Sequence, residues 1–158
     1  MAKTNEVKPV LTREEIFKKV RELKLVYTEK PQPELLIAVP NDYPGKQEVE
    51  HIDPEFTSLC PFNPGQPDFG IITFRFLPDQ WLVELKSLKF YIESFRGVKI
   101  FHESIAPMIM EDLWPLIGPY YLQILVKNSV RGGIQTTSRS YQERPNWHNN
   151  NPFSTPGR

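Results

Sequence analysis

The stretch FGIITFRFLPDQWLVELKSLKFYIESFRG, Phe69–Gly97, indicates the class of fold. Its opening segment, FGIITFRFLP, is rich in β-branched and aromatic side chains, which predicts a strand. The segment WLVEL that follows can also be extended. A helix comes next, because apolar side chains recur at helical spacing (Leu88, Tyr91, Ile92 and Phe95) and Gly97 is a natural stop. A strand followed by an amphipathic helix predicts a sheet that is covered by helices.

Segments on both sides of this stretch extend the pattern. Upstream, ELLIAVP (34–40) and QEVEHID (47–53) read as strands. Downstream, HESIAPMIMEDLWPLIG (102–118) predicts a second helix, with Pro107 in its first turn. YYLQILVKNSV (120–130) and GIQTTSRSY (133–141) then predict two strands joined around RGG.

The order strand–strand–helix–helix–strand–strand predicts an α+β fold. We expect an antiparallel four-stranded sheet with two helices on one face, the ββααββ arrangement. Four strands and two helices close a barrel poorly on their own, so we expect strand edges to pair between subunits of a homo-oligomer.

An additional helix precedes this unit. In LTREEIFKKVRELKL (11–25), Thr12 and Glu15 form a capping box, and Ile16 lies on an apolar stripe. We therefore divide the chain into an N-terminal arm and helix (1–34), a catalytic domain (35–141) and a polar, proline-broken tail (142–158).

Composition excludes several classes of function. The chain has 158 residues, enough for one domain, and its 19 Lys and Arg balance its 19 Asp and Glu, which argues against a general nucleic-acid binder. No apolar run approaches the length of a membrane span, and the first residues lack the apolar region of a signal peptide. The single cysteine allows no internal disulfide and no cysteine-rich zinc site, so we expect a soluble cytoplasmic protein without a metal.

The only cysteine, Cys60, lies in FTSLCPFNPGQPDFG, eight positions before Asp68. Most free cysteines are small buried hydrophobes, and taken alone this residue is more often structural than catalytic. The alternative is that Cys60 is a nucleophile and Asp68 its proton-handling partner, because a thiol is the strongest neutral side-chain nucleophile at neutral pH.

Two further groups of residues have both an ordinary and a functional interpretation. His102 and Glu103 open the second predicted helix, where Glu103 either complements the helix dipole or accepts two hydrogen bonds from a purine-like edge. In the functional interpretation, His102 supplies a proton at the same site. His51 and His148 have no such neighbours and are expected on the surface or in the tail.

Basic residues form the second group. Lys86 and Lys89 lie on either side of Ser87, three residues apart, so on a helix they face the same way. They form either a solvated charged face or a site that binds an anion. Arg131 precedes two glycines, where backbone can approach a ligand closely. The sequence contains neither GxGxxG nor a P-loop, so a nucleotide would be held in another way.

Five segments in order, PEFTSLCP, GQPDF, ELKSLKFY, FHE and RGGI, resemble the NADPH-dependent 7-cyano-7-deazaguanine reductases of queuosine biosynthesis, in their short single-module form. The resemblance runs from about Leu36 to Ile134, and the lysine-bearing octet ELKSLKFY is its diagnostic motif. It implies the tunnelling fold, with stacked pentameric rings, a decamer, and active sites between subunits. It also implies NADPH as cofactor and a small deazapurine nitrile as substrate, with no nucleic acid and no membrane partner.

The resemblance assigns a role to each candidate residue. Cys60 attacks the nitrile carbon to give a covalent thioimide, Asp68 delivers a proton to the nitrogen, and His102 belongs to the same catalytic group. Substrate binding falls to Glu103, which anchors the deazapurine, and to Glu84 and Ser87 of the octet. Cofactor binding falls to Lys86, Lys89, Arg131 and Gly132.

The chain departs from the family pattern at two places. CPFNPGQPD is one residue longer between Cys60 and Asp68 than the usual motif, so we expect this loop to bulge. Phe90 stands where the octet normally has leucine or tyrosine. Two alternatives stay open: an amidinotransferase-like enzyme that acts on the same nitrile in tRNA, whose relatives lack the octet, and a non-catalytic purine-binding protein of the same fold.

Overall fold

The computed structural model describes residues 11–63, 65–145 and 147. They form a four-stranded antiparallel sheet in the order β2-β3-β5-β6. Its strands are β2 (Val49–Leu59), β3 (Pro67–Leu77), β5 (Tyr121–Asn128) and β6 (Thr137–Glu143). The expected start of the N-terminal arm and most of the expected tail, His148 included, lie outside the described residues. β6 reaches Glu143 and so includes the first two residues of that expected tail.

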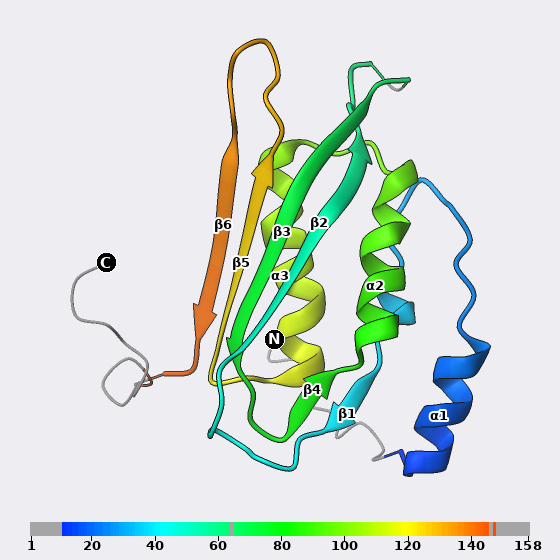
Figure 1. Ribbon diagram of the computed structural model, residues 1–158, viewed down its shortest axis with the longest axis vertical. Helices are drawn as coiled ribbons and strands as arrows, with labels where there is room; N and C mark the ends of the chain where they lie inside the picture. Colours follow the sequence, from blue (N-terminus) through cyan, green and yellow to red (C-terminus); the bar gives the residue numbers. More distant parts are fainter. Residues whose placement is uncertain (1–10, 64, 146, 148–158) are drawn as a thin grey trace, which may run out of the picture.

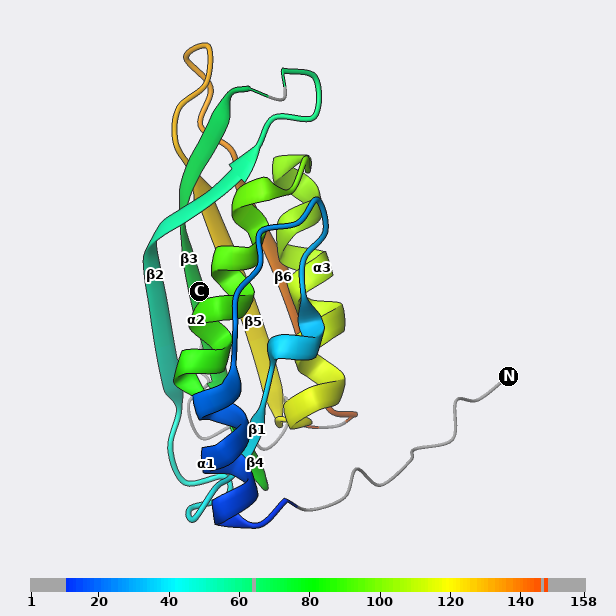
Figure 2. The same ribbon diagram turned by 90° about the vertical axis from the view of Figure 1, so that its right-hand side faces the viewer.

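Two helices, α2 (Leu85–Glu93) and α3 (His102–Ile117), cover one face of this sheet, as Figure 2 shows. The predicted α+β fold with two helices on one face is thus confirmed. Figure 1 shows α2 beside β2 and α3 behind β3 and β5; α3 also contacts β6. No helix among the described residues has the length and apolar character needed to cross a membrane.

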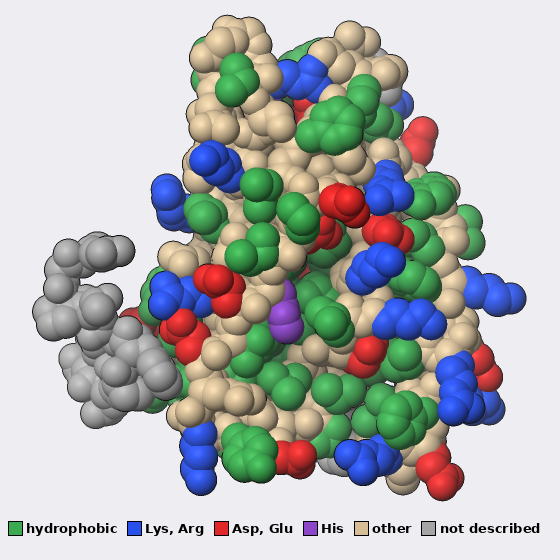
Figure 3. Space-filling view, in the orientation of Figure 1, with side chains coloured by type: hydrophobic (Ala, Val, Ile, Leu, Met, Phe, Trp, Pro, Cys, Tyr) green, Lys and Arg blue, Asp and Glu red, His purple; other side chains and the backbone are tan. Residues whose placement is uncertain are grey.

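Burial along β3 alternates and so defines the two faces of the sheet. Ile72, Phe74 and Phe76 point to the helices and are buried, whereas Phe69 and Ile71 on the other face are exposed. Figure 3 looks onto this open face, where hydrophobic side chains lie among charged ones. The buried core between the sheet and the helices includes Leu88, Phe95, Ile105, Ile109, Leu113 and Ile124.

The last residue of the octet belongs to this core. Tyr91 is fully buried, and its hydroxyl donates a 2.5 Å hydrogen bond to Asp112 Oδ2 on α3. The octet therefore fixes α2 against α3 as well as presenting lysines on its exposed side.

Upstream of the main sheet the predicted strand is shorter than expected. ELLIAVP begins with a 3₁₀ turn, η1 (Pro33–Leu35), and only β1 (Ala38–Pro40) is extended. β1 pairs with β4 (Trp81–Val83) in a separate two-stranded sheet, which confirms the extended interpretation of WLVEL. Pro33 begins the turn because its fixed φ suits the first position of a helix.

β2 is longer than predicted and runs from Val49 through Pro54 to Leu59. The pairing register with β3 shifts between Asp53 and Phe56. Since Pro54 has no amide hydrogen, a bulge at this point lets an outer strand continue past it. The extension places Cys60 directly at the end of a strand.

Pro107 lies in the second turn of α3 and not in the first, because the helix already begins at His102. A proline at this position removes the amide that would donate to the carbonyl of Glu103, four residues earlier. The helix nevertheless continues to Ile117, held by apolar side chains packed on β5 and β6.

The N-terminal helix α1 (Arg13–Glu22) has the predicted Thr12–Glu15 capping box and buries Ile16. The chain after it packs against the end of α2 and its 3₁₀ extension η2 (Ser94–Gly97). There the backbone approach is close: a Cβ added at Gly97 would lie 2.5 Å from the carbonyl oxygen of Thr28. Glycine at position 97 thus allows the segment after α1 (residues 23–32, here called the strap) to pack closely, and it also ends the helix.

We predict that Gly97→Ala destabilises the fold by about 1–3 kcal/mol, because a methyl group there forces the backbone of the strap away. Thermal unfolding of the two proteins measures the difference. Gly65→Ala is the control, since nothing lies within 4 Å of a Cβ at that position. An equal melting temperature for Gly97→Ala and the wild type would contradict the contact.

Candidate active site

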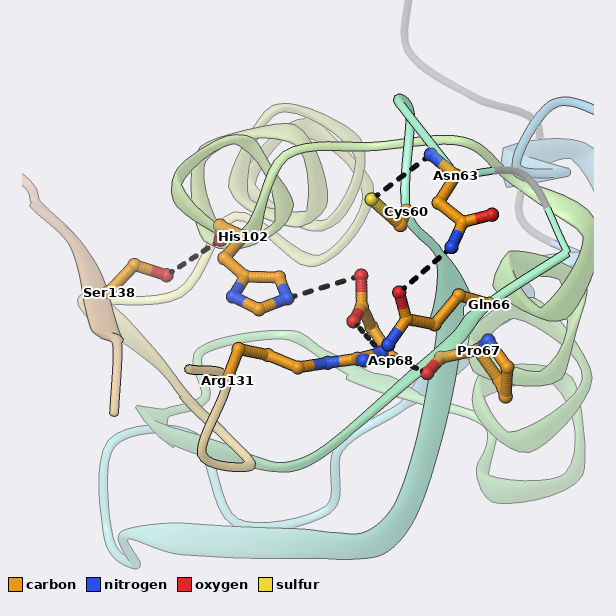
Figure 4. A network of polar contacts seen from close by, with 8 residues as sticks. All are labelled: Cys60, Asn63, Gln66, Pro67, Asp68, His102, Arg131 and Ser138. Atoms are coloured by element: carbon orange, nitrogen blue, oxygen red, sulfur yellow. Dashed lines mark hydrogen bonds and ion pairs between the residues drawn. The ribbon is translucent and has the colours of Figure 1, made fainter. Parts of the chain in front are cut away.

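One cavity of about 650 Å³ opens at the end of the sheet where β2 turns into β3. Its walls come from the β2–β3 loop, the start of α3 and the β5–β6 connection, as Figure 4 shows. Six predicted site residues line it: Cys60, Asp68, His102, Glu103, Arg131 and Gly132. The structure thus brings together the proposed nucleophile, its proton partner and four of the other eight candidates.

The pairing of β2 with β3 keeps Asp68 in this cavity. Strand pairing continues to Leu59 opposite Pro67, and the amide of Cys60 donates to the carbonyl of Gln66 at 3.1 Å. Any lengthening of the loop therefore falls beyond the hydrogen bond between Cys60 and Gln66. Asp68 stands in register opposite Ser58, inside β3.

A second set of backbone bonds fixes the loop relative to α3. The amide of Leu59 donates to the carbonyl of Val98 at 2.9 Å, and the amide of Ile100 donates to the carbonyl of Leu59 at 3.1 Å. Because Ile100 lies two residues before His102, these bonds set the spacing between the end of β2 and the start of α3.

Asp68 is the centre of the polar contacts in Figure 4. Its carboxylate is almost fully buried; Arg131 Nη2 donates to Oδ1, and His102 Nε2 lies 3.3 Å from Oδ2. The same arginine nitrogen also donates to the carbonyl of Pro67. A buried carboxylate needs such partners, since leaving it unpaired costs several kcal/mol.

Cys60 is a free, half-buried thiol on the cavity wall. The amide of Asn63 donates to its Sγ at 3.4 Å, which holds the sulfur beside the cavity. The sulfur is thus exposed to a small molecule that enters, whereas inert structural cysteines are enclosed by apolar side chains. This placement favours the reactive interpretation over the structural one.

Glu103 lies in the first turn of α3, where the helix dipole favours a negative charge. Its side chain is exposed on the cavity wall and makes no ion pair or hydrogen bond within the described part of the chain. The carboxylate is therefore available to a ligand, whereas that of Asp68 is already bound.

The octet residues lie around a different cavity, of about 590 Å³, between β2 and α2. Glu84, Lys86 and Lys89 line it, and it shares no lining residue with the first cavity. A single chain therefore does not bring Cys60 together with the octet.

Two octet residues are occupied in forming the helix itself. The Glu84 carboxylate caps α2 by accepting from the amides of Lys86 at 3.0 Å and Ser87 at 2.7 Å. Ser87 is fully buried; its hydroxyl donates to the carbonyl of Glu84 at 2.7 Å and accepts from the amide of Ile37 at 3.1 Å. Within one chain, Ser87 thus joins the start of α2 to Ile37, the residue that precedes β1.

The two lysines remain on the outer side. Lys86 Nζ donates to the carbonyl of Val20 on α1 at 2.8 Å and lies 5.4 Å from the ring centre of Phe90. Lys89 is largely exposed, with its Nζ 3.9 Å from the carboxylate of Glu93. Lys89 is thus the more available cation of the pair.

Sequence reasoning missed some neighbours of these sites. Arg96 joins the lysines in the second cavity, and only its place one turn beyond Glu93 could have indicated this. His51, expected on the surface, is half-buried in that cavity, with its ring centre 5.8 Å from that of Phe76. The pairing of Arg131 with Asp68 was also not expected from the sequence.

The fold and the cavity define a tunnelling-fold protein whose thiol stands beside a buried carboxylate. The fold is similar to that of a solved structure described as "Crystal structure of the archaeosine synthase QueF-Like in the apo form", with a TM-score of 0.56 and 22% identity. The match covers 63% of this chain and 95% of the other, and at this identity it concerns the fold alone.

Sequence comparison gives the family. Residues 67–147 match the QueF-like protein family, a region that begins after Cys60 and contains Asp68, the octet and Arg131. This chain belongs to that family. It is 48% identical over 110 residues to the NADPH-dependent 7-cyano-7-deazaguanine reductase of Acidithiobacillus ferrooxidans, covering 69% of this chain and 77% of the relative. It is 43% identical over 113 residues to the protein of the same name from Chloroherpeton thalassium, and the match covers 70% of this chain and 97% of the relative.

The half-buried histidine of the second cavity predicts a pH dependence of stability. Burial lowers the pKa of His51 below its ordinary value, so the folded chain resists protonation. The unfolded chain takes up this proton near its usual pKa of about 6.5, and stability is lost as the pH falls below that value.

We therefore expect His51→Gln to lose less stability than the wild type between about pH 7 and pH 5. Urea unfolding at a series of pH values measures both slopes. Parallel curves for the two proteins would show that His51 does not contribute.

Proposed function

We propose that this chain reduces the nitrile of 7-cyano-7-deazaguanine to an aminomethyl group with NADPH, in the cytoplasmic synthesis of queuosine. The observation that carries the proposal is the placement of Cys60 and Asp68 on the walls of one cavity. The names of relatives that are 43% and 48% identical support the same reaction.

In the proposed first step, the sulfur of Cys60 adds to the nitrile carbon. The S–H bond breaks, an S–C bond forms, one π bond of the nitrile opens, and the nitrogen gains the proton. Asp68 carries this proton from sulfur to nitrogen, and His102, 3.3 Å away, exchanges protons with it. The product is a covalent thioimide on Cys60.

Glu103 recognises the base in this proposal. Its exposed carboxylate, free of partners in the described chain, accepts hydrogen bonds from the two adjacent N–H groups of a guanine-like ring. Loss of such a pair leaves buried donors unpaired, so recognition should depend strongly on this residue.

NADPH, when bound, supplies two hydrides in succession, one from each of two molecules. The residues present fit its phosphates, because Lys86, Lys89 and Arg96 border one cavity whose walls include Leu88 and Ile92. Arg131 and Gly132, which line the first cavity, are the other two residues assigned to the cofactor. There Arg131 also neutralises Asp68, and Gly132, with φ of +56°, allows a close approach of backbone.

We further propose that a complete site forms between subunits of a homo-oligomer, two stacked pentameric rings. β2 and β6 are the outer strands of the sheet and run antiparallel, so their edges can pair from one subunit to the next. α2 lies beside β2 (Figure 1), and α3 contacts β6. Such pairing brings the octet of one subunit, with Glu84 and Ser87, toward the Cys60 cavity of its neighbour.

We predict that Cys60→Ala forms no adduct with the nitrile and does not oxidise NADPH. Intact-mass spectrometry without NADPH detects the adduct on the wild type, and loss of NADPH absorbance then follows reduction, at two NADPH per nitrile. A nitrile adduct on Cys60→Ala would contradict the assignment. An adduct on the wild type without NADPH oxidation would point to addition without reduction, as an amidinotransferase-like enzyme requires; neither signal would point to binding alone.

We predict that Lys89→Ala raises the KM for NADPH by about tenfold or more, since hydrogen bonds to charged groups contribute about 1.5–3 kcal/mol. Adduct formation with the nitrile should stay at the wild-type rate. Lys30→Ala removes an exposed lysine that lines neither cavity and serves as the control. Unchanged NADPH kinetics in Lys89→Ala would count against the cofactor role of α2.

A further inference from the structure

Two buried polar side chains beside Asp68 have unmet hydrogen bonds. Ser58 is 0% exposed and Asn128 is 1% exposed. The hydroxyl of Ser58 and both polar atoms of the Asn128 amide find no hydrogen-bond partner among the described residues. These three atoms are most of the unpaired buried side-chain atoms in the described chain; the other two belong to Thr57 and Trp147.

Strand register places both side chains around Asp68. Ser58 on β2 stands opposite Asp68, and Asn128 on β5 stands opposite Gly70, two positions further along β3. Residues two apart on a strand share a face, so all three side chains point toward the helices. Direct and diagonal neighbours across strands lie within reach of one another.

Gly70 lets β5 approach β3 closely at this point. A Cβ built there would lie 3.0 Å from the carbonyl oxygen of Lys127 and 3.4 Å from Asn128 Oδ1. The amide of Asn128 therefore packs against a position of β3 that has no side chain, two residues along the strand from Asp68.

Unpaired buried polar groups are costly, at about 1–3 kcal/mol each. Proteins retain them where an internal water, bonded to two to four polar groups, satisfies them. Here a hydroxyl, an amide and a carboxylate supply such a set. The carboxylate has unused capacity, because its two oxygens accept about four hydrogen bonds and Arg131 and His102 account for two.

We propose that Ser58 and Asn128 are positioning residues for Asp68. Both side chains bond to one buried water, and this water donates a hydrogen bond to the Asp68 carboxylate. The inference rests on the proposed function, in which Asp68 carries a proton. While the carboxylate is protonated, its pairing with Arg131 weakens, and the water bonded to Ser58 and Asn128 keeps it facing the sulfur. Besides His102 of α3 and Arg131 of the β5–β6 connection, the cavity presents Cys60 and Glu103 to this carboxylate.

The test compares Ser58→Ala and Asn128→Leu with the wild type. Each should lower kcat, and the rate of nitrile adduct formation without NADPH, by about tenfold, as expected for a lost hydrogen bond to a charged group. The KM for the nitrile should change by less than about twofold, because neither residue lines the cavity. The pH profile of kcat should shift, which a purely structural role would not cause.

Ser94→Ala is the matched control. Ser94 is also a fully buried serine, but it lies in η2 and lines neither cavity. Its replacement should lower the melting temperature, because its hydroxyl donates to the carbonyl of Tyr91, while the pH profile of kcat stays as in the wild type.

If Ser58→Ala keeps the wild-type kcat and pH profile, its hydroxyl is merely an unpaired group and the inference is wrong. A high-resolution crystal structure gives a readout without turnover and does not depend on either variant folding. A water that bridges Ser58, Asn128 and Asp68 supports the inference, and protein atoms filling that space overturn it. Failure of the wild type to form an adduct would instead overturn the proposed function.

Discussion

The antiparallel pairing of β2 with β3 is the constraint on which the site depends. Its register continues to Leu59 opposite Pro67, so the loop between them begins and ends at fixed points. Since the backbone of Leu59 also bonds to the segment before α3, one short hairpin end positions Cys60, Asp68 and His102 together. The length of the loop can therefore differ without moving the carboxylate.

Much of this could be predicted from the sequence, because it depends on local patterns. The β-branched and aromatic content of FGIITFRFLP, the helical spacing after Glu84 and the Thr12 capping box each describe one element, and each prediction was confirmed. The pairing of Arg131 with Asp68 was harder to predict, because the two residues lie 63 positions apart in the chain. The same holds for Ser58 and Asn128, whose positions relative to Asp68 depend on strand register across three strands.

The separation of the two cavities affects how mutations in the octet are interpreted. Glu84 and Ser87 build the start of α2, and Tyr91 packs in the core, so their replacement changes the helix as well as any ligand contact. Lys89 differs, because its side chain is largely exposed and, among the described residues, has only a weak ion pair with Glu93. A binding role can therefore be tested cleanly at Lys89 and only with stability controls at the other positions.

The open face of the sheet has a consequence for the free subunit. It exposes Ile52, Phe69, Ile71 and Tyr141, and both outer strands have backbone groups without a sheet partner in the described chain. Such surfaces are templates for incorrect association as well as for assembly. In the proposed homo-oligomer, correct pairing and aggregation would therefore compete for the same newly folded chains, and the outcome would depend on how quickly each chain meets a correctly oriented neighbour.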